Sequence, residues 1–292
     1  MHKYLRTIGF STYQKKKDIN KLLHALEQAS DRRQRIQIEP ETNLCEVRAE
    51  IAPGMGLAIV GEVDEHGIFQ REYYYPYLTS HDISSTVDCS IQRHTEKETF
   101  AGLLDENRVG ISLIFYLDNG FEYRERLLDR SSTRPVSVNL TGLSIEGKIL
   151  LPLHKTMKQI EMAKVAAKDR NSLLEAARNG DEDAMETLTI EDIDMYSQIS
   201  RRVMKEDLYS IVDSCFMPSG IECDQYSVIG EITQIEEKVN QITSETVYDL
   251  TLNCNDMIFH VAIAKLDLLG EPVVGRRFKG QIWMQGIANF AD

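Results

Sequence analysis

The sequence contains no long apolar run, no paired-cysteine motif and only one tryptophan among its 292 residues. Its longest unbroken apolar stretches, such as residues 149–151, are only a few residues long. A membrane-spanning helix needs roughly 18–20 apolar residues. The first residues, which include Lys3 and Arg6, also lack the apolar core of a secretory signal. We therefore expect a cytoplasmic protein that makes no contact with a membrane.

The cysteines are few, and their pattern excludes two kinds of stabilising site. Their number is odd, their spacing is wide, and no Cys-x-x-Cys occurs, which argues against a disulfide framework and against a structural zinc site. We expect reduced and mostly buried thiols, with no metal and no cofactor. The five are Cys45, Cys89, Cys215, Cys223 and Cys254.

Basic residues are scarcer than acidic ones, with 33 Lys+Arg against 46 Asp+Glu and a formal net charge of −13. An acidic protein repels polyphosphate, so nucleic acid is disfavoured as a partner. The charge is uneven, because residues 1–35 carry nine Lys/Arg and three Asp/Glu, whereas residues 171–224 carry four and thirteen. We interpret the basic segment as a solvated helix face with its flanking loop, and leave open its pairing with an acidic face of the same chain or of a second copy.

The first half of the chain is predicted to be an α+β domain. Residues 15–29 place Ile19, Leu22, Leu23 and Leu26 at spacings of three and four, which indicates an amphipathic helix. The period then changes to two, and strands are expected at 45–51, 57–63, 68–75, 109–117, 121–128, 136–140 and 148–151. Residues 64–67 and 118–120 have the composition of hairpin turns. An antiparallel sheet with one helix is expected here.

The remainder is predicted to be a helical bridge followed by a small barrel. Helices are expected at 154–178, at 182–188 and from 189 to about 215, with Asp181 as an N-cap. Strands at 226–235, 246–252, 257–264 and 275–287 suit a small β-barrel of the OB or SH3-like type. At about 150 residues per domain the length indicates two domains. We expect residues 1–152 as an N-terminal α+β domain, 153–224 as an acidic bridge and 225–292 as the barrel.

Recognisable catalytic motifs are missing. Gly54, Gly56 and Gly61 do not have the spacing or the following helix of a dinucleotide fingerprint. No metalloprotease H-E-x-x-H and no G-x-S-x-G elbow occurs. An unrecognised enzyme site in the N-terminal domain stays open, with candidates at His66, His81, Cys89 and His94.

Two aromatic segments are the candidate ligand-binding residues. In the run 73–77, alternation puts Tyr73 and Tyr75 on one face. In the segment 275–286, Phe278, Ile282 and Met284 share the apolar face, and the single tryptophan, Trp283, shares the basic face with Arg277 and Lys279. A tryptophan beside basic side chains can stack on nucleobases or sugars. Because residues 225–292 as a whole carry a net charge of −4, we favour packing of Trp283 against the helical segment or another chain.

Four segments resemble a known family. They are residues 1–11, 110–117, 216–222 and 275–286. Together they are similar to an uncharacterised family of clostridial Firmicutes proteins that is catalogued as a domain of unknown function. The resemblance extends over nearly the whole chain. It implies a bacterial cytosolic protein and carries over no catalytic or binding residue.

The leading hypothesis is therefore a non-catalytic cytosolic binding or scaffold protein that acts through protein–protein contacts. One alternative is oligonucleotide or oligosaccharide binding through Arg277, Lys279 and Trp283 on an OB-like barrel. The other is an enzyme with a site in the N-terminal domain. We expect a protein partner of unknown identity and leave homo-oligomer formation open.

Overall fold

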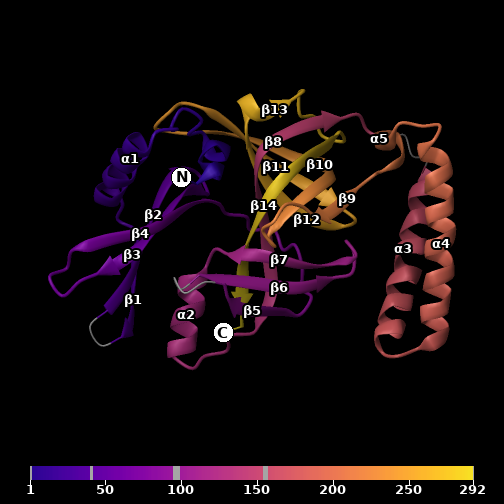
Figure 1. Ribbon diagram of the computed structural model, residues 1–292, viewed down its shortest axis with the longest axis horizontal. Helices are drawn as coiled ribbons and strands as arrows, with labels where there is room; N and C mark the ends of the chain where they lie inside the picture. The colour runs from indigo at the N-terminus through magenta and orange to yellow at the C-terminus, as the bar shows by residue number, and fades with distance from the viewer. Residues whose placement is uncertain (1, 40–41, 95–98, 154–156, 292) are drawn as a thin grey trace.

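The computed structural model describes residues 2–39, 42–94, 99–153 and 157–291. It is a mixed α+β structure in which two sheets form the body, and a pair of long helices stands off to one side (Figure 1). The α+β class expected from the sequence is confirmed. Because sheet side chains alternate between faces, each sheet here buries one face against its neighbour.

Sheet A contains β1 (Arg33–Glu39), β2 (Thr42–Ala52), β3 (Met55–Val63) and β4 (Phe69–Leu78), all antiparallel. The 3-10 helix η1 (Lys3–Ile8) and α1 (Lys16–Ala29) precede it. The expected α1 is confirmed, with Ile19, Leu22 and Leu23 buried on its inner face. The β3–β4 turn is confirmed as well, because the Asp64 carboxylate accepts from the backbone of His66 and Ile68.

Sheet B has ten strands. They are β5 (Cys89–Arg93), β6 (Phe100–Glu106), β7 (Ile111–Leu117), β8 (Pro135–Leu150), β9 (Cys215–Pro218), β10 (Gln225–Val239), β11 (Thr246–Cys254), β12 (Met257–Ala264), β13 (Leu268–Leu269) and β14 (Arg277–Phe290). A short 3-10 helix, η2 (Lys265–Asp267), precedes β13.

Five of these strands close into a ring, in the order β8, β12, β11, β10 and β14, because β14 also pairs with β8. We call it the five-stranded ring. Phe278, Ile282 and Met284 are fully buried in the core cluster that fills it, which confirms the expected apolar face of β14. Gly147 and Gly280 make room for the Phe278 ring, since a Cβ at either position would come within 2.4 Å or 2.6 Å of it.

Sheet B draws strands from both sides of the expected border at residue 152. Strand β8 lies in the segment expected as the N-terminal domain, yet it closes the ring between β12 and β14. A second core cluster packs sheet A, α1 and η1 against residues of the ring, among them Leu143 and Trp283. One sheet thus runs across the expected border at residue 152. The expected division at 152 and 224 stays a prediction.

Three expected elements differ from the structure. Residues 121–128 are not a strand but part of helix α2 (Gly120–Leu128), which an Arg126–Glu122 ion pair one turn apart stabilises. The two short strands expected between 136 and 151 are one strand, β8. The two helices expected from 182 are one helix, α4 (Glu182–Val203), which begins at the expected Asp181 cap.

The helical segment forms a hairpin, and the expectation that it bridges two domains stays a prediction. Helix α3 (Met157–Arg178) runs away from the ring and α4 returns, followed by the short α5 (Leu208–Ile211). In Figure 1 the α3–α4 pair covers neither sheet and stands beside the body. Among the helices that the structure describes, none combines the length and the hydrophobicity needed to cross a bilayer.

Candidate functional site

Trp283 is buried beneath the N-terminal segment. Its side chain is 7% exposed, stacks on Tyr4 with ring centroids 5.3 Å apart, and lies 4.9 Å from the His2 ring. Its indole Nε1 donates to the Asp224 carboxylate at 2.7 Å. Burial raises the pKa of Asp224, and the hydrogen bond from Trp283 opposes that rise. Trp283 thus packs within its own chain, against η1 rather than against the helical segment, and no open stacking face is left.

Arg277 fixes both ends of the helical segment to the five-stranded ring. Its guanidinium donates to the Leu151 carbonyl, just before α3, from Nε at 3.0 Å and from Nη2 at 2.9 Å. It also donates to the carbonyls of Tyr209 at 2.7 Å and Val212 at 2.5 Å, just after α4. Burial lowers the pKa of the Arg277 guanidinium. One buried side chain on β14 therefore holds the start and the end of the hairpin together.

Lys279 has a similar role nearby. Its ammonium contacts the Tyr209 hydroxyl and lies 4.5 Å from the centre of that ring. Lys148 lies 4.4 Å from the same ring. The two cations lower the pKa of the Tyr209 hydroxyl. Arg277 and Lys279 are thus occupied by α5 and its flanks.

Tyr75 belongs to a buried polar cluster between sheet A and β7. Its hydroxyl donates to Glu46 at 3.0 Å. Arg48 donates to Glu46 at 2.9 Å and to both carboxylate oxygens of Asp118 at 3.0 Å. Burial raises the pKa of Glu46, and Arg48 opposes that rise. Glu46 and Asp118 are both buried, and burial of a carboxylate costs free energy. The Arg48 guanidinium offsets that cost because it pairs with both carboxylates.

The space beside this cluster is too small for a substrate. Glu46, Tyr73, Tyr75 and Tyr116 are among the residues that line a cavity of about 10 Å³, which has room for about one water molecule. A carboxyl group of raised pKa next to a phenol could exchange a proton. A site closed to anything larger than water has no substrate to exchange it with, so the cluster joins the two sheets.

The structure brings Trp283, Tyr73 and Tyr75 together, but in the interior. Tyr116 lies 5.4 Å from Trp283 and 4.8 Å from Tyr75, and Tyr75 stacks on Tyr73 at 6.5 Å. Arg277 and Lys279 lie apart from this aromatic row, at the end of the ring where the hairpin begins. The five candidate residues therefore do not share one exposed surface.

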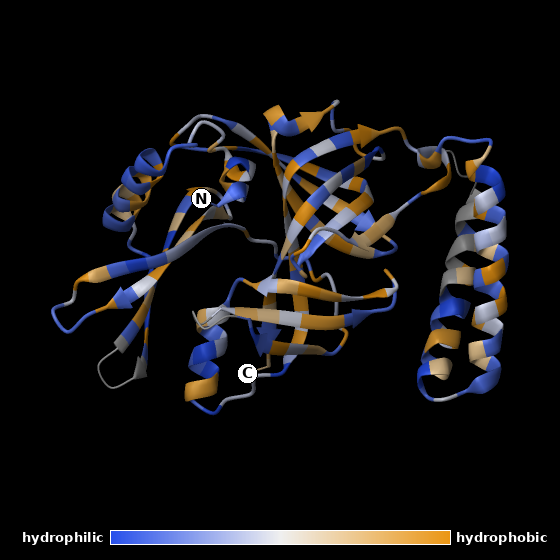
Figure 2. Ribbon diagram, in the orientation of Figure 1, coloured by the Kyte–Doolittle hydropathy of each residue, from blue (hydrophilic) through white to orange (hydrophobic). Residues whose placement is uncertain are grey.

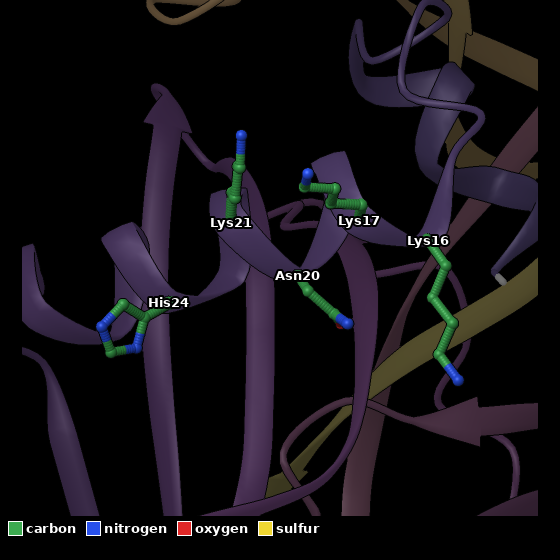
Figure 3. A pocket seen from close by; sticks show the side chains of 5 residues that line it. All are labelled: Lys16, Lys17, Asn20, Lys21 and His24. Atoms are coloured by element: carbon green, nitrogen blue, oxygen red, sulfur yellow. The ribbon is translucent and has the colours of Figure 1, made fainter.

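The basic face of α1 borders an open depression of about 560 Å³. It is lined by Lys16, Lys17, Asn20, Lys21 and His24. Figure 3 shows that Lys17 and Lys21 point to one side of the helix, whereas Lys16 and Asn20 point to the other. Side chains that diverge cannot hold one anion together, so this surface fits the solvated helix face expected from the sequence.

The histidines and the thiol named as enzyme candidates lie at different places in the two sheets. His66 lies at the β3–β4 turn, His81 follows β4, and His94 follows β5. Cys89 is buried, and this burial raises the pKa of its thiol to about 11, which makes it a poor nucleophile near neutral pH. Within the described ranges, no three His, Cys, Asp or Glu side chains gather in a metal-binding arrangement.

One histidine that the sequence did not single out is held between two carboxylates. His260 Nδ1 lies 2.9 Å from Asp249, and Nε2 lies 2.9 Å from Asp82. Lys238 lies 3.0 Å from the second oxygen of the buried Asp249. The two carboxylates raise the pKa of His260, against the effect of burial. Since both ring nitrogens are occupied, His260 ties the segment after β4 to the ring.

One surface of exposed apolar residues lies on the α3–α4 hairpin. Only Ala184 and Leu188 are buried along α4, and Arg170 of α3 pairs with Asp192 at 2.7 Å. Figure 2 shows apolar residues at intervals along both helices. Five of those on α4 form what we call the apolar stripe: Met185 (45% exposed), Ile193 (60%), Tyr196 (75%), Ile199 (41%) and Val203 (45%).

The hairpin is also electrically divided along its length. The half near the ring, residues 157–168 and 194–203, carries five Lys/Arg and two Asp/Glu, a net +3. The half near the α3–α4 turn, residues 169–193, carries two and eight, a net −6. An exposed apolar stripe with charge of opposite sign at its two ends is typical of a surface that meets another protein.

One family model matches residues 5–286, and its description reads "Domain of unknown function, E. rectale Gene description (DUF3881)". The chain belongs to this family. The match confirms the resemblance inferred from the sequence, and the family description assigns no chemistry to any residue of DUF3881. A search of curated proteins and a search of solved structures both found no match.

Reasoning from the sequence missed the apolar stripe of this DUF3881 chain, although the signal was present. The sequence shows Ile193, Tyr196, Ile199 and Val203 on one face of a helix, but not whether another element covers that face. In the structure Ala184 and Leu188 are buried at one edge of this apolar side. An apolar side wider than one helix contact leaves part of it free for a second contact.

Proposed function

We propose that the protein is a cytoplasmic, non-catalytic binding or scaffold protein, and that it binds other protein through the apolar stripe of α4. The observation that carries this proposal is the exposure of Ile193, Tyr196 and Ile199 together on a hairpin that stands beside the body. A contiguous exposed apolar surface on a folded protein usually marks an interaction site. A tyrosine among aliphatic side chains is typical of the centre of a protein interface.

The rest of the fold supports this role. We infer that the five-stranded ring is a small barrel of the OB or SH3-like type that acts as the platform for the hairpin. Arg277 and Lys279, which could have contacted a ligand on such a barrel, bind the hairpin's two ends instead. Trp283 is covered by η1. Arg277 and Lys279 are therefore used to hold the protein-binding element in place, and Trp283 is buried within the body.

The test is site-specific photo-crosslinking in the native host. A photoreactive amino acid at Tyr196 should crosslink to a defined protein, whether a different chain or a second copy. The control is the same amino acid at Leu266, which is equally exposed on η2 and lies away from the hairpin. No crosslink from position 196, or equal crosslinking from both positions, would contradict the proposal.

A further inference from the structure

We propose that the protein bound by the apolar stripe is a second copy of this chain, with the two α4 helices packed antiparallel across a twofold axis. This inference rests on the proposed function, because it names the partner of the same surface. Three observations carry it: the symmetry of the stripe, the division of charge along the hairpin, and the size of the exposed face.

The apolar stripe can pack against a second copy of itself that runs in the opposite direction. At 3.6 residues per turn, Met185, Ile193, Tyr196, Ile199 and Val203 fall within an arc of about 120°. Met185 and Val203 lie nine residues on either side of residue 194. In an antiparallel pair centred there, Met185 of one copy meets Val203 of the other, and Ile193 and Tyr196 of both copies meet near the axis. An isologous contact requires this kind of self-complementary surface.

The charges select the antiparallel direction. The half of the hairpin near the ring carries a net +3, and the half near the turn carries a net −6. An antiparallel pair places each basic half against the acidic half of the other copy. Centred on residue 194, it brings Glu186 to the same level along the helix axis as Arg202 of the second copy, which in its own chain pairs with Glu206. A parallel pair would place acidic on acidic, which costs free energy in an interface.

The size of the face suits a dimer that dissociates on dilution. A helix of 22 residues is about 33 Å long, and two packed helices present a face about 20 Å wide. If both helices take part, each hairpin would thus cover about 650 Å², and a contact through α4 alone would cover about half of that, which is less than most stable protein interfaces bury. The acidic residues Glu182, Asp183 and Glu186 beside the stripe would be repelled by an anionic lipid surface, so a membrane fits this face less well.

The test uses two charge-reversed forms of the full-length protein. One carries Arg201→Glu with Arg202→Glu, and the other carries Asp183→Lys with Glu186→Lys. Each form alone places like charges together at both ends of the interface. In an equimolar mixture, every acidic end again meets a basic end of the other form. Sedimentation velocity from about 1 µM to about 100 µM measures the mass of each sample.

Wild-type protein is expected to move from one chain toward two over this range, and each charge-reversed form to dimerise at least tenfold more weakly. The mixture should recover dimer formation, which a loss of folding in either form could not produce. Circular dichroism checks that each form keeps its helix content. A wild-type protein that stays monomeric throughout, or charge-reversed forms that dimerise as tightly as wild type, would overturn the inference.

The outcome also separates this inference from the proposed function. A monomeric wild type whose position 196 crosslinks to a different host protein overturns the second copy and leaves the protein-binding function standing. A monomer that crosslinks to nothing overturns both. A dimer whose position 196 crosslinks to its own chain supports both.

Discussion

Arg277 donates two hydrogen bonds to the carbonyl of Leu151, at 3.0 Å and 2.9 Å, and thereby joins the last strand of the ring to the start of the helical segment. The same guanidinium holds Tyr209 and Val212 at the other end of that segment. A side chain with several donors in one plane can bind several carbonyls at once. The orientation of the hairpin is thus set at its root.

Substitution of Arg277→Met should loosen the hairpin root. The carbonyls of Leu151, Tyr209 and Val212 would lose their shared donor, and a hydrogen bond to a charged group contributes on the order of 1.5–3 kcal/mol. We expect faster amide hydrogen exchange and faster proteolysis within residues 157–212, with smaller changes in the ring. Exchange measured by mass spectrometry checks this expectation.

The matched control is Arg276→Met. Arg276 is the adjacent residue, and its Nη1 donates only to the carbonyl of Glu271, away from the hairpin. Its substitution should leave exchange in residues 157–212 unchanged. Equal effects of the two substitutions would argue against a specific role for Arg277.

We expect the cluster of Glu46, Arg48 and Asp118 to contribute strongly to the free energy of unfolding, because it joins sheet A to the end of β7. Substitution of Arg48→Met leaves two buried carboxylates without their cation, which costs about 3–5 kcal/mol of unfolding free energy. Urea unfolding gives the value. The control Arg32→Met breaks the exposed pair with Glu50 and should cost no more than about 1 kcal/mol. Similar losses for both arginines would contradict the assignment.

His260 should make the stability fall as the pH rises above the unfolded pKa of a histidine, about 6.5. Its pKa is raised in the folded state, so the folded protein binds the proton more tightly than the unfolded chain. The stabilisation is fully present below the unfolded pKa of about 6.5 and is lost as the pH rises through the folded pKa. We expect the wild-type free energy of unfolding to fall over that range relative to His260→Gln.

The control for this pH dependence is His66→Gln, because His66 is exposed at the β3–β4 turn. This variant should follow the wild-type pH curve. A wild-type curve parallel to that of His260→Gln would show that the contacts with Asp82 and Asp249 do not raise the pKa of His260.

Trp283 is the single tryptophan and so reports directly on its surroundings. We expect a blue-shifted native emission that acrylamide quenches weakly, because the side chain is covered by Tyr4 and bonded to Asp224. Substitution of Trp283→Ala should cost about 3–5 kcal/mol of unfolding free energy. Strong quenching in the native state, or a spectral change on addition of oligonucleotide, would favour the stacking alternative instead.

Local patterns predicted much of the secondary structure. The spacing of Ile19, Leu22 and Leu23 located α1, the turn residues 64–67 located the β3–β4 hairpin, and Asp181 marked the start of α4. The prediction was wrong at residues 121–128, where apolar and polar residues alternate closely enough to suit either a strand or a helix. Short segments carry too few turns to separate the two periods.

The sequence by itself determined the α+β class, most of the helices and strands, the apolar face of β14 and the family. Only the tertiary structure decided that β8 closes the ring with β12 and β14, that Trp283 lies under η1, and that Arg277 holds the hairpin root. These contacts join residues more than 60 positions apart. Local periodicity indicates which side of a helix or strand is apolar, but it does not indicate which other element packs against that side. The stripe on α4 was therefore visible in the sequence as apolar, and only the fold showed it to be exposed.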